Sequence, residues 1–247
     1  MSSFPLTRPS PHDVHVWQWD LDGRDGDLDG YWAMLSTEER ERARQFCLER
    51  HRRRYVAGRG ELRRILGRYL ALSPHAVAFG YGAQGKPFCA AQPAGAEIRF
   101  NLSHSENVAA LAVSNGFDVG IDIERIRKIE ENVPLEVFSA RECAAFNALP
   151  DAGERQAVFF ENWARKEACL KALGTGFTLP PVHFEFDLYI RGDTTPRFVG
   201  GDAREAVHWR IRALITGSTC AGAVAARRAN FSIVNMSPEF SSDSFSS

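Results

Sequence analysis

The alternation of apolar and polar residues predicts β-strands in several separate segments of this chain. Residues 14–21, with the sequence VHVWQWDL, are typical, because every second side chain suits a buried face. The same pattern predicts a strand that runs into a glycine-rich turn within residues 77–88. Further strands are predicted over residues 98–105, 108–114, 118–126, 182–190, 196–200, 207–215 and 221–227.

A helical period replaces this alternation in two regions. Residues 36–72 carry apolar side chains at helical spacing and begin with Ser-Thr-Glu-Glu, which is typical of a helix N-cap, so one or two helices are expected there. Ser139 can cap a helix over residues 140–149. A longer helix is predicted over residues 154–173, ending at Gly174.

The order of these elements suggests two halves, because helices are followed by paired strands twice along the chain. A boundary is expected near Asn115 and Gly116, which gives an N-terminal half over residues 1–115 and a C-terminal half over residues 116–230. Residues 231–247 are serine-rich and are predicted to be a disordered tail.

Composition limits the class of protein. The 247 residues are 44% hydrophobic with a formal charge of −1, which predicts a globular protein without a general affinity for nucleic acid or membranes. Five cysteines without a CxxC pair indicate reduced thiols rather than disulfides or zinc. No signal-peptide core and no apolar run long enough for a membrane span are visible, so a cytoplasmic location is expected.

Two acids stand out in the predicted strand GIDIER, residues 120–125. Asp122 and Glu124 share one face of that strand, and two buried carboxylates so close together would need a cation such as Mg²⁺. The alternative is that both acids face solvent while Ile121 and Ile123 face the core, and the alternation alone favours that interpretation.

A third acid adds weight to the metal hypothesis. Glu167 and Lys171 lie one turn apart on the predicted helix over residues 154–173, which is also the spacing of an ordinary surface ion pair. With a metal, the lysine would suit a phosphorylated substrate. Ser103 and His104 at the end of a strand can also contact an anion, although alone they are a weak signal.

An arginine-rich region lies in the N-terminal half. Eleven arginines occur between Arg40 and Arg68. Such a run is most often a solvated helical face, but it would also suit a nucleic acid or a small, highly charged anionic cofactor. A nucleic-acid-binding module therefore stays open as an alternative function.

Four motifs, in this order, resemble those of the Sfp-type 4'-phosphopantetheinyl transferases. They are GKP at residues 85–87, FNLSHS at 100–105, GIDIER at 120–125 and WARKEACLKALGTG at 163–176. The resemblance implies an α+β fold, a pseudo-dimer of two similar α/β halves with the active site in the cleft between them. The N-terminal half would bind coenzyme A, and the C-terminal half would carry the magnesium and catalytic residues.

The resemblance also implies the reaction. The enzyme would transfer the 4'-phosphopantetheine arm of coenzyme A to a serine of an apo acyl or peptidyl carrier protein, releasing adenosine 3',5'-bisphosphate. Mg²⁺ or Mn²⁺ would be the cofactor, and the carrier would serve fatty acid, polyketide or nonribosomal peptide biosynthesis. A cytoplasmic monomer with no nucleic acid or membrane partner is expected.

Residue roles follow from the same resemblance. Asp122, Glu124 and Glu167 would bind the metal, and Lys171 would neutralise charge on the pyrophosphate. Glu142 would be the general base, or else only an acid at a helix N-terminus. Glu106 departs from the family pattern, in which a glycine is common after SHS. The candidate coenzyme A contacts are Arg42, Arg54, Arg59, Lys86, Pro87, Ser103, His104, Lys166 and Lys171.

Overall fold

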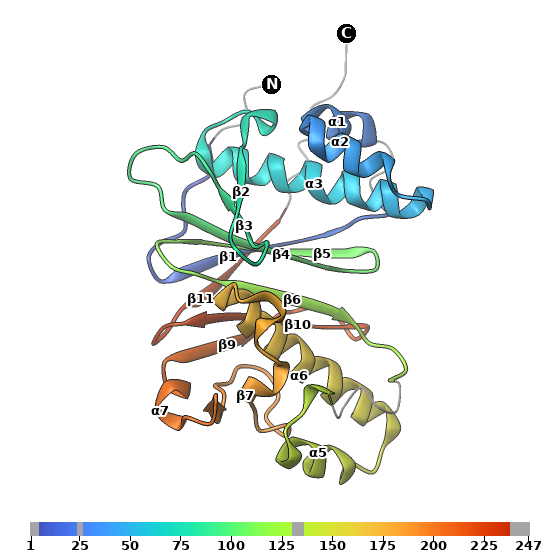
Figure 1. The fold of residues 1–247 in the computed structure, drawn as a ribbon, viewed down its shortest axis with the longest axis vertical. Helices are drawn as coiled ribbons and strands as arrows, with labels where there is room; N and C mark the ends of the chain where they lie inside the picture. Colours follow the sequence, from blue (N-terminus) through green and yellow to red (C-terminus); the bar gives the residue numbers. More distant parts are fainter. Residues whose placement is uncertain (1–4, 24–26, 130–135, 238–247) are drawn as a thin grey trace.

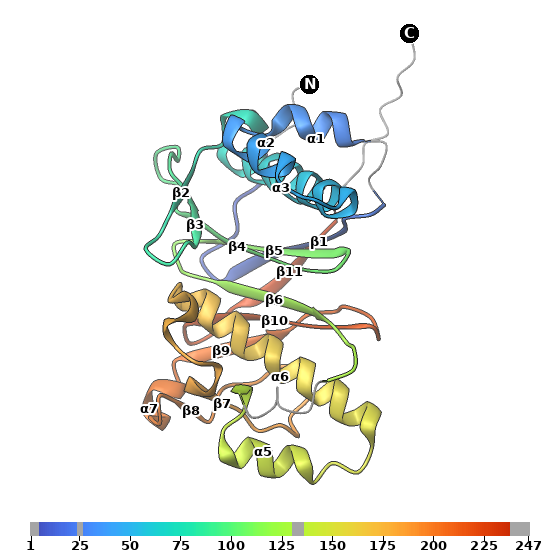
Figure 2. The same cartoon turned by 45° about the vertical axis from the view of Figure 1, so that its right-hand side comes forward.

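The computed structural model describes residues 5–23, 27–129 and 136–237. Two β-sheets lie back to back in the middle of the molecule, and a layer of helices covers the outer face of each (Figure 1). The rotated view separates these four layers (Figure 2). The predicted α+β architecture of two halves is confirmed.

The N-terminal half contains a four-stranded sheet in the order β11-β1-β5-β4. Its strands are β1 (Asp13–Asp20), β4 (Ile98–Ser105), β5 (Val108–Asn115) and β11 (Ser232–Met236). Its helices are α1 (Leu28–Met34), α2 (Thr37–Arg44), α3 (Glu49–Leu70) and η2 (Pro74–Ala76). The hairpin of β2 (Phe79–Tyr81) and β3 (Pro87–Cys89) extends from this half toward the C-terminal half (Figure 1).

The C-terminal half contains a three-stranded sheet in the order β6-β10-β9, covered by the long helix α6. The strands are β6 (Gly120–Arg125), β9 (Trp209–Ala213) and β10 (Cys220–Arg227), with a separate pair β7 (Phe184–Glu185) and β8 (Phe198–Val199). The helices are α5 (Ala140–Asn147), α6 (Ala152–Leu173), η3 (Gly176–Thr178), η4 (Pro181–His183) and α7 (Ala203–Ala206).

A shared hydrophobic core joins the two sheets. Val14 and Val16 of β1 pack with Ala112 of β5 and with Ile121 and Ile123 of β6. All five side chains are at most 1% exposed. The halves are therefore fixed to each other through apolar burial, which is the largest favourable term in folding.

The predicted helix ends are confirmed by their hydrogen bonds. The Ser36 hydroxyl accepts from the Glu39 amide, and the Glu39 carboxylate accepts from the Ser36 amide, so both halves of a capping box are present. Ser139 and Glu142 form the same motif at α5. Helix α6 ends at Gly174, whose φ of 68° is left-handed.

Three expectations about elements need correction. The strand predicted over residues 182–190 is only two residues long, and so is the one predicted over 196–200. Helix α1 was not expected from the sequence pattern. The predicted disordered tail begins too early, because residues 232–236 form β11 beside β1; residues 238–247 lie outside the described residues.

Candidate active site

Strand β6 turns its two acids toward helix α6. The alternation places Ile121 and Ile123 in the core between the sheets and leaves Asp122 and Glu124 on the opposite face. Asp122 is only 2% exposed, so the alternative in which both acids face solvent is wrong for this residue. Glu124 is half-buried.

Helix α6 supplies partners to both acids. The Lys171 ammonium lies 2.6 Å from Oδ1 of Asp122, and the indole N–H of Trp163 donates to Oε1 of Glu124 at 3.1 Å. Lys171 therefore forms its ion pair across to the strand rather than the i,i+4 surface pair with Glu167 that its spacing allowed. Because Gly120 has no side chain, β6 can approach α6 closely: a Cβ there would lie 1.9 Å from the Ala168 carbonyl oxygen.

A cavity of about 660 Å³, which we call the cleft pocket, gathers most of the predicted site residues from both halves. Asp122, Glu124, Glu167 and Lys171 lie in its wall on the C-terminal side. Its wall on the N-terminal side is formed by Gln84, Gly85, Lys86, Asn101, Ser103 and His104. The remaining lining is Glu136, Val137, Trp163, Leu170, Gly174, Gly176, Leu179, Pro180 and Pro181.

Burial raises the pKa of two of these acids. It raises the pKa of Asp122 to about 7, with a smaller contribution from the charge of Glu124, while Lys171 acts in the opposite direction. Burial and then the charge of Glu124 raise the pKa of Glu167. Carboxylates in this situation gain from a neighbouring cation.

The donor set fits a hard cation in one specific respect. Oδ2 of Asp122 is buried and has no hydrogen-bond partner among the described atoms, although a carboxylate oxygen is a strong acceptor. In the described part of the chain, no group of three histidine, cysteine, aspartate or glutamate side chains lies close enough together to hold a metal ion. The assignment of Asp122, Glu124 and Glu167 as metal ligands stays a prediction.

Lys86 is in the cleft wall, but its ammonium already has two partners. It donates to the carbonyl oxygens of Val119 and Ala172, each at 3.1 Å. Burial lowers its pKa. The ammonium thus ties the start of β6 and the last turn of α6 to the β2–β3 hairpin, and Pro87 follows as the first residue of β3.

Glu142 and Lys166 form a buried pair away from the cleft pocket. Oε2 of Glu142 lies 2.7 Å from the Lys166 ammonium, and the two side chains are 1% and 0% exposed. The same carboxylate accepts from the amides of Ser139 and Phe186, both at 2.8 Å. Neither residue lines the cleft pocket. Of the two roles weighed for Glu142, this geometry favours the structural one. Lys166 is fully buried and pairs with Glu142, so the predicted contact of its ammonium with coenzyme A is not supported.

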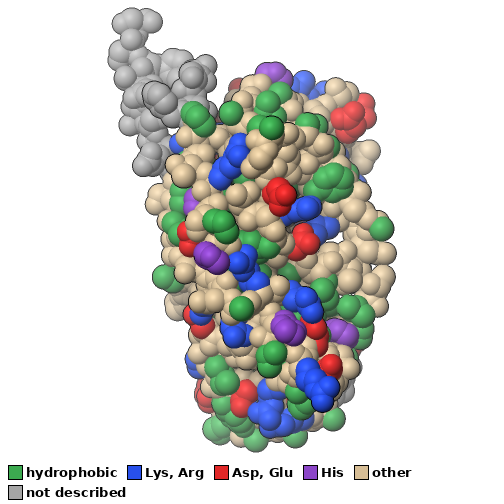
Figure 3. Space-filling model, turned by 90° about the vertical axis from the view of Figure 1, so that its left-hand side faces the viewer, with side chains coloured by type: hydrophobic (Ala, Val, Ile, Leu, Met, Phe, Trp, Pro, Cys, Tyr) green, Lys and Arg blue, Asp and Glu red, His purple; other side chains and the backbone are tan. Residues whose placement is uncertain are grey.

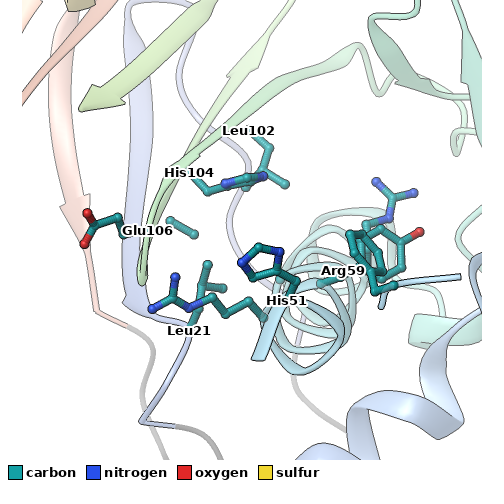
Figure 4. Close-up of a pocket in the computed structure, with 11 residues that line it drawn as sticks. Leu21, His51, Arg59, Leu102, His104 and Glu106 are labelled. Atoms are coloured by element: carbon teal, nitrogen blue, oxygen red, sulfur yellow. The ribbon is translucent and has the colours of Figure 1, made fainter. Parts of the chain in front are cut away.

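A second cavity of about 380 Å³, the α3 pocket, lies between helix α3 and strands β4 and β5. His51 projects from α3 toward Leu102 and His104 of β4 (Figure 4), and Arg59 of the same helix also lines the cavity. Desolvation of the His104 imidazole in the pocket wall, together with the charges of Lys171 and Arg54, lowers its pKa. His104 lines both pockets, so the α3 pocket and the cleft pocket adjoin.

The three candidate arginines are placed differently. Arg54 and Arg59 line the α3 pocket and pair with Asp22 and Glu39. Arg42 is exposed and is not part of the lining. Further arginines of α3 are ion-paired, namely Arg52, Arg63 and Arg64.

This pairing weakens the nucleic-acid alternative, since acidic partners neutralise much of the arginine run. On the face shown in Figure 3, basic, acidic and hydrophobic side chains are interspersed. Within the described ranges, no helix combines the length and the apolar character that crossing a membrane requires.

Trp163, Ser105 and Asn101 are site residues that motif reasoning missed. Trp163 and Ser105 bind Glu124, and Asn101 accepts from the amide of Ile121. The signal that could have found two of them is the polar residue at every second position of NLSHS, which is unusual on a strand face directed inward.

The two halves bring acids and lysines together in the cleft between them, a donor set of the kind that phosphoryl-transfer enzymes use. Comparison with known proteins gives the family. A family model described as the 4'-phosphopantetheinyl transferase superfamily matches residues 118–224, and one described as 4'-phosphopantetheinyl transferase, N-terminal, matches residues 19–116.

Relatives cover most of the chain. The 4'-phosphopantetheinyl transferase HetI of Nostoc sp. is 37% identical over 215 residues, which is 86% of this chain and 87% of that protein. A 4'-phosphopantetheinyl transferase of Bacillus subtilis is 31% identical over 66% of this chain and 70% of that protein. The human L-aminoadipate-semialdehyde dehydrogenase-phosphopantetheinyl transferase is 29% identical over 62% of this chain and 53% of its own length. The chain belongs to the 4'-phosphopantetheinyl transferase superfamily, as its motifs predict.

Proposed function

We propose that this transferase moves the 4'-phosphopantetheine arm of coenzyme A onto a serine hydroxyl of an apo acyl or peptidyl carrier protein in an Mg²⁺-dependent reaction at the cleft pocket. The observation that carries the proposal is the buried Asp122 carboxylate, paired on one oxygen with Lys171 and unpartnered on the other. A cation bound here would give the unpartnered Asp122 oxygen a partner and would neutralise the carboxylate charge. A pyrophosphate would supply further oxygen ligands to that cation.

Asp122, Glu124 and Glu167 would hold the metal ion, because all three carboxylates line the same cavity. When bound, the ion would supply charge neutralisation and polarisation for the coenzyme A pyrophosphate. Mn²⁺ shares the preference for carboxylate and water ligands, so it is expected to substitute.

The chemical step follows from the remaining groups. The carrier serine oxygen attacks the phosphorus that bears the pantetheine arm, and the bond from this phosphorus to the oxygen of the adenosine-side phosphate breaks. Lys171 stands beside the charge that develops on that leaving phosphate. Glu167, a carboxylate in the wall of the same cavity, takes the serine proton.

The α3 pocket is the proposed site for the phosphorylated adenosine end of coenzyme A. Arg54, Arg59 and His51 give this cavity basic side chains, and it adjoins the cleft pocket at His104. Phosphate oxygens would compete with Asp22 and Glu39 for the two guanidinium groups, which can bind phosphate bidentately.

The proposal is tested by incubating the protein with coenzyme A, Mg²⁺ and a panel of apo acyl and peptidyl carrier proteins. We expect the carrier mass to rise by one phosphopantetheine group, and the rise to disappear with a chelator or in Glu167→Gln. Unchanged masses across the panel would contradict the transferase assignment. Full activity in the presence of chelator would contradict only the metal assignment.

A further inference from the structure

Strand β4 contacts strand β6 of the other half through side chains instead of a backbone ladder. The amides of Ile121, Ile123 and Arg125 donate to Oδ1 of Asn101, Oγ of Ser103 and Oγ of Ser105, at 2.8, 3.4 and 3.0 Å. Each pair is separated by 20 residues in the sequence, so the two strands run in the same direction and in constant register.

These bonds give partners to backbone amides that would otherwise be unpaired at the edge of a sheet. Both β4 and β6 are edge strands, and β6 pairs with β10 on its other side only. Its outward amides would lack partners in a buried position, which is costly for backbone donors. The three polar side chains take the place that backbone carbonyls would have in a continuous sheet.

The two serine hydroxyls also donate hydrogen bonds to the two acids of β6. Ser103 donates to Oδ1 of Asp122 at 2.9 Å, and Ser105 donates to Oε2 of Glu124 at 3.1 Å. Ser103 also accepts from the Lys171 ammonium at 3.0 Å, so its single donor and both lone pairs are occupied. A hydroxyl satisfied in this way is oriented by its neighbours and has no lone pair left for coenzyme A.

We propose that Asn101, Ser103 and Ser105 form a side-chain ladder that fixes the register of the halves and positions the Asp122 and Glu124 carboxylates for the reaction. The ladder makes these three residues positioning residues rather than ligands of substrate. Their role in the reaction rests on the proposed function, whereas their role in holding β6 does not.

Hydrogen exchange of individual backbone amides tests the ladder in the metal-free protein. Ser105→Ala should increase the exchange rate of the Arg125 amide about tenfold or more, and Asn101→Ala should do the same at Ile121. Ser114→Ala is the matched control, because Ser114 is also buried but donates to the Phe117 carbonyl three residues further along the chain and not to an acid of β6. Unchanged exchange at Arg125 and Ile121, or an increase spread evenly over both sheets, would overturn the proposal.

Steady-state transfer to an apo carrier protein tests positioning. Ser105→Ala should lower kcat about tenfold with less than about a twofold change in KM for coenzyme A, and Ser105→Thr, which keeps the hydroxyl, should recover most of the loss. An equal loss in Ser105→Thr, or a loss confined to KM, would overturn the positioning role. If the wild-type protein transferred no phosphopantetheine, the proposed function would be wrong. The hydrogen-exchange experiment would still show whether the side-chain ladder holds β6.

Discussion

At the scale of single residues, the burial of Asp122 predicts how stability depends on pH. Its pKa of about 7 in the fold lies above that of an unfolded aspartate, so the folded carboxyl binds more protons between about pH 4 and pH 7. Stability of the metal-free protein should therefore fall as pH rises through this range. Asp122→Asn removes the effect. Above pH 7 its free energy of unfolding, measured by denaturant titration, should exceed that of the wild type by on the order of 2 kcal/mol.

The same variant separates stability from metal binding. Mg²⁺ should raise the thermal midpoint of the wild-type protein, because a ligand of the native state stabilises it, and should leave Asp122→Asn unchanged. Transfer activity should be lost in the variant. An equal response of both proteins to Mg²⁺ would remove Asp122 from the metal site.

Glu142→Gln distinguishes a structural acid from a catalytic base. The substitution leaves the Lys166 ammonium buried without its counter-charge, so we expect a loss of about 3 kcal/mol in urea unfolding. Activity per folded molecule, measured well below the unfolding midpoint, should stay close to wild type. A large loss of kcat with unchanged stability would instead support the general base.

The placement of side chains was predictable where it depends on local geometry. Strand alternation correctly placed Ile121 and Ile123 opposite Asp122 and Glu124. It could not place Glu142, because the partner that neutralises it, Lys166, lies 24 residues further along the chain. Contacts of this kind depend on packing and leave no periodic signal.

At the scale of elements, the close approach of β6 and α6 should be sensitive to one methyl group. In Gly120→Ala the added Cβ meets backbone atoms of Ala168 and Ala172, which cannot rotate away, so the helix must shift. We expect a loss of about 1–3 kcal/mol in chemical unfolding and a lower kcat. Gly153→Ala near the start of the same helix is the control, since its Cβ meets only the Asp151 side chain at 3.1 Å. Equal stability of the two variants would contradict tight packing here.

Lys86 offers a second test of element placement. Lys86→Met keeps the length of the side chain but removes the donors to Val119 and Ala172, leaving two carbonyls without this partner. The thermal midpoint should fall, and Lys86→Arg should recover part of the loss. If Lys86→Met changed only the KM for coenzyme A, a direct phosphate contact would be the better explanation.

Prediction of the capped helices succeeded and prediction of the short strands failed for a physical reason. Ser36, Ser139 and Gly174 mark helix ends through bonds within a few residues. In the stretch predicted as a strand over residues 182–190, Phe184, Phe186 and Leu188 are buried as the alternation predicts. The amide of Phe186 nevertheless donates to Glu142 instead of to a neighbouring strand, so the burial pattern is present without the ladder.

At the scale of the whole molecule, β11 links the end of the chain to its beginning. After the three-stranded sheet is complete, the chain returns to the N-terminal half, and Ser232–Met236 pairs in parallel with β1 from Asp13 to Trp17. The sequence could not indicate this, since the partner lies more than 200 residues away and the strand is mostly exposed. The two halves are consequently held together by a strand from the far end of the chain as well as by their shared core.

This closure predicts that the halves unfold together and that β11 contributes to both. A chain ending at residue 231 exposes the outer edge of β1 and loses the packing of Ile233 on the core between the sheets. We expect its urea midpoint to fall relative to a chain ending at residue 237, which retains the strand, with a single transition reported by probes in either half. Two separate transitions in the longer chain would show that the halves are independent. Equal midpoints of the two chains would show that β11 adds no stability, and the link between the halves would then rest on the shared core and the β4 side-chain ladder alone.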